Sequence, residues 1–245
     1  MAGKTGAGKT TVAALLALAG AAAGRRVLAV DTDGSPNLGL SLGLDMDALA
    51  AARSVPRVLV TGRAGGGVSA EQLVTNYGLV TSSGVTVLHA LAMGDETAGC
   101  GCAAHASARS VLADALGEPG DLVVLDLEGG LDHLDRPAGT LAHVDALVVV
   151  LEASRKSALS AARTVGQARA QGLAAVAAVG NKARPGEDEG EIFTAFAAEQ
   201  AVALAGVLPW SDDVFEADRA GSGLDLRPGP LADAVGQVVA ALSSS

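Results

Sequence analysis

Residues 3–11 read GKTGAGKTT and match the phosphate-binding pattern G-x-x-x-x-G-K-[ST]. Glycine has no side chain, so the backbone here can bend tightly and turn its N–H groups toward one point. An anion at that point also faces the N-terminus of the helix that follows. The sequence therefore predicts a binding site for the polyphosphate of ATP, formed by Gly3, Lys4, Thr5, Gly6, Ala7, Gly8, Lys9, Thr10 and Thr11.

Two side chains of this loop have distinct predicted roles. Lys9 is expected to contact the β- and γ-phosphates, and the Thr10 hydroxyl is expected to ligate Mg²⁺. Lysine usage supports this interpretation over a glycine-rich turn that only caps a helix. The chain has four lysines, and two of them, Lys4 and Lys9, lie in the loop.

Polar residues follow three apolar runs downstream. Asp126 ends the run 122–126 (LVVLD), the Walker B arrangement, in which a buried strand presents a carboxylate to Mg²⁺. Asp33 follows the run 26–30 (RVLAV), and we expect it to join the Mg²⁺ site and to orient the attacking water. Asn181 and Lys182 follow the run 174–179, where an Asn amide can bind the adenine edge.

A second possible chemistry lies at Cys100-Gly101-Cys102. Thiolates are soft ligands for Zn²⁺, Ni²⁺ or Cu⁺, but one pair supplies only two of the four preferred ligands. A two-fold homodimer would bring two pairs together and complete a tetrahedral site. Two free cysteines in a glycine-rich loop are the alternative.

Lys4, at the second position of the loop, resembles the deviant Walker A lysine of the MinD/ParA/nitrogenase-iron-protein ATPases. Residues 126–136 (DLEGGLDHLDR) closely resemble the switch II pattern D-x-E-A-G-x-E-H-x-x-R of the CooC family, with Gly129 and Asp132 as mild departures. Residues 99–102 (GCGC) occupy the place of that family's G-x-G-C-x-C segment, and residues 208–211 (LPWS) also look family-like.

This resemblance implies a dimeric ATPase that assists nickel insertion into carbon monoxide dehydrogenase or a related client metalloenzyme. It implies that Lys4 acts across the dimer, and that Cys100 and Cys102 bind Ni²⁺ or Zn²⁺ at the interface. Nucleotide contacts are implied for Asn181, Lys182 and Pro209. His133 could add a metal ligand, but a switch-loop histidine bonded to backbone or carboxylate is the favoured reading.

The elements that must position these residues alternate along the chain. Apolar runs at 26–30, 85–91, 122–126, 146–151, 174–179 and 202–208 are separated by helical patterns that include 10–23, 103–116, 155–171, 190–200 and 231–242. This alternation predicts an α/β fold: a doubly wound, mostly parallel sheet with helices on both faces, in one domain over residues 1–245. Only Met1 and Ala2 precede Gly3, so the first strand is expected to be truncated in this sequence.

Composition limits the function classes. The net charge is −10 and the pI about 4.7, which disfavours binding to nucleic acid or anionic membranes. No apolar run reaches the length of a membrane span, and we expect a cytoplasmic protein. Two other functions remain open: a MinD/ParA-type positioning or partition ATPase, and a non-catalytic metal-bridged binding module.

Overall fold

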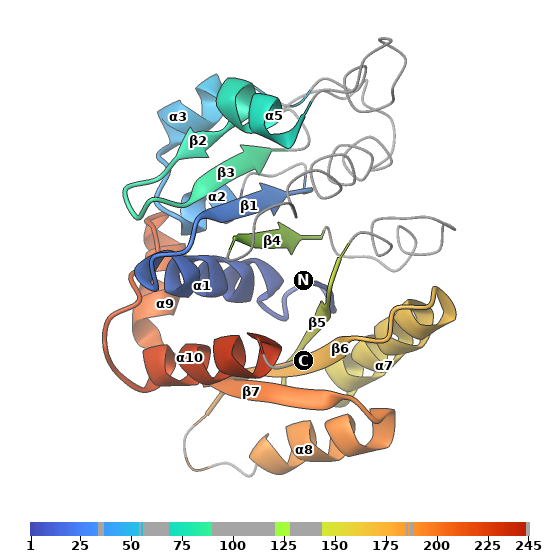
Figure 1. Cartoon of the computed structure of the whole chain (residues 1–245). Helices are drawn as coiled ribbons and strands as arrows, with labels where there is room; N and C mark the ends of the chain where they lie inside the picture. The colour runs from blue at the N-terminus through green and yellow to red at the C-terminus, as the bar shows by residue number, and fades with distance from the viewer. Residues whose placement is uncertain are drawn as a thin grey trace.

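A computed structural model describes residues 1–33, 37–53, 55, 69–89, 121–127, 144–184, 186 and 189–243. The helix expected at 103–116 lies outside these ranges, as do Cys100, Cys102 and His133. Within them, helices pack on both faces of mostly parallel β-structure, which confirms the predicted α/β class (Figure 1).

The strands form two sheets. The first has the order β2-β3-β1-β4, and the second has the order β5-β6-β7. Every pairing is parallel except that of β2 with β3. Because both faces are covered, the central strands are apolar almost throughout. Their bounds are β1 Val27–Asp31, β2 Leu79–Val80, β3 Thr86–His89, β4 Leu122–Asp126, β5 Leu147–Leu151, β6 Val176–Ala183 and β7 Ala203–Pro209.

Met1 and Ala2 join the two sheets. The Met1 amino group donates to the Leu125 carbonyl, and the Leu127 N–H donates to the Met1 carbonyl at 3.3 Å. On the other side, Ala2 pairs with β5 through bonds of 2.9 and 2.8 Å. The first strand is thus present as two residues between β4 and β5, and burial lowers the pKa of the Met1 α-amino group to about 6.

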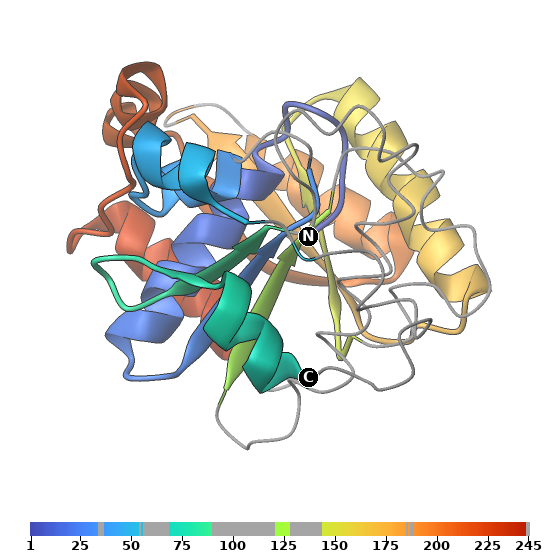
Figure 2. The same cartoon turned by 90° about the horizontal axis from the view of Figure 1, so that it is seen from above.

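Helices cover the sheets in two layers. Small side chains such as Ala13, Ala14 and Ala17 let α1 pack closely on β1 and β4. Figure 2 shows α1 on one side of the strands and α7 on the other. The helices α1 (Lys9–Ala22), α2 (Asn37–Ser41) and α10 (Pro230–Ser243) share one face, while α5 (Ala70–Tyr77), α7 (Arg155–Ala170) and α8 (Glu189–Gln200) share the other.

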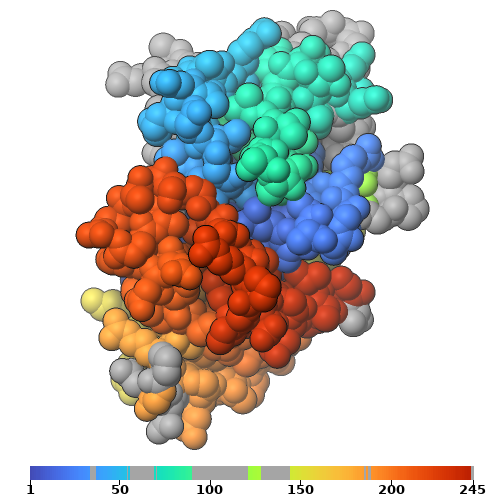
Figure 3. Space-filling view, turned by 90° about the vertical axis from the view of Figure 1, so that its left-hand side faces the viewer, coloured from blue at the N-terminus to red at the C-terminus, as the bar shows by residue number. Residues whose placement is uncertain are grey.

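The region 45–84, which periodicity left largely unassigned, contains short elements. Here α3 (Met46–Ala51) begins at the Asp45 cap, and α5 begins at a capping box between Ser69 and Gln72. A helix that the sequence did not predict, α9 (Asp212–Ala220), follows β7. The chain after α9 packs on α2, since the Leu224 N–H donates to the Ser41 carbonyl at 2.8 Å; Figure 3 shows this face.

A matched pair of substitutions tests the core assignment. Phe193 of α8 is fully buried against Gly180 of β6, where a Cβ would lie 2.7 Å from the ring. We expect Phe193→Ala to lower the free energy of unfolding by about 3–5 kcal/mol. Phe215→Ala, at a side chain that is 49% exposed, should change it by less than about 1 kcal/mol. Denaturant unfolding measures both, and equal losses would contradict the placement of Phe193.

Candidate functional site

The predicted phosphate loop lies at the carboxyl ends of the strands, between β5 and the start of α1. Gly3 has φ 143°, and a Cβ there would lie 2.3 Å from the Val150 carbonyl oxygen. Gly8 has φ 89°, and a Cβ there would lie 2.2 Å from the Asn181 amide nitrogen. Both positions therefore require glycine, because any side chain would strain the backbone and collide with the neighbouring strands.

The start of α1 is open to an anion. Within the described chain, no side chain caps the first turn, which begins after Gly8. The first N–H groups of a helix lack intrahelical partners, so here they face the loop's concavity. Lys9 is buried to 9% exposure at the same place. These groups together can bind and neutralise a polyphosphate.

β6 braces the loop from the side. The Asn181 amide donates to the Ala7 carbonyl at 2.9 Å, and the Lys182 ammonium donates to the Gly6 carbonyl at 2.7 Å. Lys182 also pairs with Glu152, just after β5, at 2.7 Å. Lys182 has φ 61°, an uncommon backbone conformation for a residue with a side chain. The predicted adenine contact of Asn181 stays a prediction, while its amide nitrogen holds the loop.

Thr10 and Asp126 meet as the Walker B pattern predicts. The Thr10 hydroxyl donates to one Asp126 carboxylate oxygen at 2.6 Å. The other oxygen is buried and finds no hydrogen-bond partner among the described residues. Burial raises the pKa of Asp126, and the Thr10 hydrogen bond opposes that rise. A hydroxyl beside a carboxylate with one unsatisfied oxygen is a donor set that suits Mg²⁺.

Asp31 ends β1 directly beside Asp126, its register partner on β4. Its two carboxylate oxygens accept the N–H groups of Asp33 at 3.0 Å and Leu38 at 3.1 Å. Asp31 thereby holds both ends of the segment that carries Asp33, the carboxylate predicted to orient the attacking water. Burial raises the pKa of Asp31 to about 8, although the two backbone hydrogen bonds oppose this.

A polar hollow of about 300 Å³ opens beside the N-terminal turn of α1. It lies between α1, α2 and α9, so it adjoins both the phosphate loop and the helix that follows Asp33. Its polar lining side chains are Thr10, Thr11, Asn37, Ser41, Asp218 and Ser222.

The structure brings most of the predicted residues to one edge and adds others. Pro209 ends β7 opposite Ala183 of β6, close in the chain to Asn181 and Lys182. Lys4 lies half-buried in the loop, whereas the cysteine pair and His133 fall outside the described residues. Sequence reasoning missed Glu152 and the anchoring role of Asp31. The position of Asp31 at the end of an apolar run could have indicated its role. No pattern in the sequence marks the single Glu152 that follows β5.

His89 ends β3 next to Asp31 and is 5% exposed. Its Nε2 atom has no hydrogen-bond partner in the described part of the chain, and burial lowers its pKa. A neutral imidazole packed against Gly39 of α2 fits a structural role.

Comparisons with known proteins agree with this geometry. Residues 1–224 match the family described as the CobQ/CobB/MinD/ParA nucleotide binding domain. The carbon monoxide dehydrogenase accessory protein CooC of Rhodospirillum rubrum is 32% identical, over 92% of this chain and 89% of its own.

Two solved structures show the same fold. MinD in the MinC:MinD cell division complex of Aquifex aeolicus has a TM-score of 0.73 at 19% identity, covering 100% of this chain and 94% of its own. Cobyrinic acid a,c-diamide synthase from Mycobacterium smegmatis, with bound ATP analogue and magnesium, has a TM-score of 0.68 at 22% identity. It covers 99% of this chain and 92% of its own.

The raised pKa of Asp31 predicts a pH dependence. A carboxyl that is protonated in the folded state and ionised in the unfolded state stabilises the fold at low pH. This stability is full below about pH 4 and is lost as pH rises through about 8. In the nucleotide-free protein, Asp31→Asn should therefore flatten the fall of the melting temperature between pH 5 and 8.

Comparing the pH profile of Asp31→Asn with that of the unsubstituted protein isolates the contribution of Asp31. The Met1 amino group, whose pKa is lowered to about 6, acts in the opposite direction between pH 6 and 8, but equally in both proteins. Asp47→Asn, at an exposed carboxylate of α3, is the control. A pH profile that Asp31→Asn leaves unchanged would contradict the assignment.

The two roles of Asn181, bracing the loop and contacting adenine, can be separated by comparing a ligand that lacks adenine with ATP. Asn181→Ala removes the donor to the Ala7 carbonyl, so affinity for inorganic tripolyphosphate should fall about fivefold to tenfold, the worth of one hydrogen bond. An adenine contact would make the loss for ATP larger. Calorimetric titration measures both affinities, with Asn76→Ala, at an exposed position of α5, as the control. Unchanged tripolyphosphate binding would rule out the brace, and equal losses would rule out the adenine contact.

Proposed function

Because this chain belongs to the CobQ/CobB/MinD/ParA nucleotide-binding family, and within it to the CooC-type accessory ATPases, we propose that it is a metal-loading maturation factor. The protein is a P-loop ATPase. In the proposed function, residues 1–245 form one ATPase domain, and hydrolysis drives transfer of nickel, or of zinc, to a client metalloenzyme such as carbon monoxide dehydrogenase.

The proposed ATP hydrolysis rests on one observation, the Thr10–Asp126 contact beside the open N-terminus of α1. In this proposal the loop N–H groups and Lys9 bind the β- and γ-phosphates. Thr10 and Asp126, with Asp33 nearby, would hold Mg²⁺, which neutralises charge on the phosphate oxygens. Asp33 orients the attacking water, and Asp31 fixes the backbone that positions it.

Metal is the cargo in this proposal, and it is bound by the cysteine pair. Cys100 and Cys102 of one protomer would join the same pair of a second protomer in a four-thiolate site. Lys4 would contact phosphate across the same dimer. Support comes from the 32% identity to CooC and from the sequence around these residues.

The strand order supports coupling between the two halves. β1, which leads to Asp33, lies between β3 and β4. The chain from β3 leads to Cys100, and the chain from β4 begins with Asp126 and continues into the switch-like residues 128–136. Loss of the γ-phosphate at the central strands is therefore transmitted to segments that start from adjacent strand ends.

Metal content and mass in solution, each with and without ATP, test this function. We expect about one Ni²⁺ or Zn²⁺ per dimer, following a four-thiolate site shared by two chains. The double variant Cys100→Ala/Cys102→Ala should lose the metal and the metal-dependent dimer but keep ATP binding.

The matched control is Lys9→Ala, which should lose hydrolysis while keeping both cysteines. Unchanged metal stoichiometry in the cysteine variant would contradict the proposed metal site at Cys100 and Cys102. Delivery of metal to a client by Lys9→Ala would instead show that hydrolysis is not needed and would favour the binding-module alternative.

A further inference from the structure

Every charged side chain of α7 is basic, in a chain whose net charge is −10. Arg155, Lys156 and Arg163 are exposed on this helix. Leu159 and Arg163 follow Arg155 at intervals of four residues, so all three lie on one side of α7. Figure 2 shows α7, in yellow, at the outer edge of the molecule. We call Arg155, Lys156, Leu159 and Arg163 the basic stripe.

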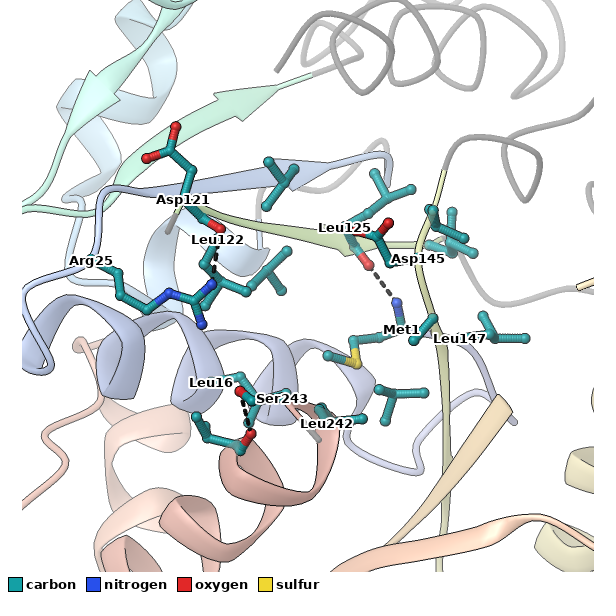
Figure 4. Close-up of a pocket in the computed structure, with 17 residues that line it drawn as sticks. Met1, Leu16, Arg25, Asp121, Leu122, Leu125, Asp145, Leu147, Leu242 and Ser243 are labelled. Atoms are coloured by element: carbon teal, nitrogen blue, oxygen red, sulfur yellow. Dashed lines mark hydrogen bonds between the residues drawn. The ribbon is translucent and has the colours of Figure 1, made fainter. Parts of the chain in front are cut away.

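The arginines of the basic stripe lack the partners that other arginines have. In the part of the chain that the structure describes, Arg155 and Arg163 contact no acceptor and no aromatic ring, whereas every other arginine does. Figure 4 shows one of the paired arginines, Arg25, which donates to the Asp121 carbonyl at 2.9 Å. The others are Arg26, Arg53, Arg169, Arg184, Arg219 and Arg227. The charge of the stripe is therefore available to a molecule outside this chain.

Two features of α7 are unfavourable for a helix by itself. Arg155 and Lys156 occupy its first turn, where the helix dipole disfavours cations and where no acid is present. Gly166 lies in the helix interior, where glycine is less favourable than alanine, and a Cβ there would meet nothing within 4 Å. A bound anionic segment would offset the first cost, and the missing side chain of Gly166 lets another backbone approach closely.

The chemistry of the stripe distinguishes between anionic partners. Leu159 is 60% exposed between the two arginines, and a phosphate backbone offers it no apolar contact. Few phosphates could be neutralised by three cations, and the net charge of the whole chain repels nucleic acid and anionic membranes. A helix that carries carboxylates on either side of an apolar residue fits both the cations and Leu159.

We propose that the basic stripe docks an acidic amphipathic helix of a protein partner. Carboxylates of that helix pair with Arg155 and Arg163, and an apolar side chain packs on Leu159. Rows of side chains four residues apart on both helices give the contact its geometry.

The docking surface lies close to the nucleotide site. α7 follows β5 through Glu152, which pairs with Lys182 at 2.7 Å. Lys182 in turn donates to the Gly6 carbonyl of the phosphate loop. A partner on the first turns of α7 is therefore near the site where ATP would bind. Naming this partner as the client metalloenzyme rests on the proposed function, whereas the docking surface does not.

A fluorescently labelled synthetic helix tests the surface directly. The peptide has about 15 residues, with a glutamate four residues before and four residues after a central leucine. Fluorescence anisotropy measures its affinity for the protein without nucleotide or metal. Arg155→Glu/Arg163→Glu should weaken binding at least about tenfold, because two attractions become repulsions. Leu159→Ser should weaken it about fivefold, because an apolar contact is lost.

The matched control is Arg219→Glu/Arg227→Glu, which changes the net charge equally at two exposed arginines. It should weaken peptide binding by less than about twofold, because distant exposed charges are screened. An equal loss in this control, or no loss in the α7 variants, would overturn the proposal. A labelled DNA duplex is the second probe. DNA binding that Arg155→Glu/Arg163→Glu abolishes would assign the stripe to nucleic acid and would also overturn the proposal.

Purified carbon monoxide dehydrogenase is the third probe, and it tests only the identity of the partner. Binding that Arg155→Glu/Arg163→Glu weakens, and that the control leaves unchanged, would support the client as the partner. Peptide binding through the stripe without client binding would contradict the client named in the proposed function and would leave the docking surface supported. ATP hydrolysis and metal content, which test the proposed function, should be the same in Arg155→Glu/Arg163→Glu as in the unsubstituted protein.

Discussion

The pairing of β1 with β4 places two buried carboxyl groups, Asp31 and Asp126, side by side at the carboxyl edge of a parallel sheet. Burial disfavours the charged form of each, and the two repel one another. The structure offsets this with specific partners: two backbone N–H groups for Asp31 and the Thr10 hydroxyl for Asp126. One Asp126 oxygen has no partner among the described residues, and the proposed function places the divalent cation there.

The phosphate loop depends on that edge and on strands from the second sheet. β5 approaches Gly3 so closely that no side chain fits, and β6 supplies the Asn181 and Lys182 donors to the loop carbonyls. The loop is therefore held by backbone contacts on one side and by side-chain hydrogen bonds on the other. A loop held in this way loses less conformational freedom when it binds phosphate, as the proposed function requires.

The two sheets give the site its geometry. Within the described residues, the first sheet carries the acids and the second carries the loop's braces, and Met1 with Ala2 is the backbone link between them. The distance between Asp126 and the phosphate loop is therefore set by the positions of β4 and β5 on either side of Met1 and Ala2. The backbone link at Met1 and Ala2 therefore contributes to the geometry of the nucleotide site.

Local chemistry was readable from the sequence. The spacing of glycines with Lys9 and Thr10 defines a phosphate loop, and an acid at the end of an apolar run defines the Walker B position, because both depend on short-range geometry. Alternating apolar runs and helical patterns likewise predicted the parallel sheet. Capped short elements such as α3 and α9 were missed, since their signals lie in single capping residues such as Asp45 and Ser211.

Only the tertiary structure decided which distant residues touch. Glu152 as the partner of Lys182 and Asn181 as a brace for Ala7 each join segments that no local pattern relates. The pairing of Met1 and Ala2 between β4 and β5 also follows from strand order rather than from composition. Hydrogen bonds between strands depend on register and neighbour, and these are set when the chain packs as a whole.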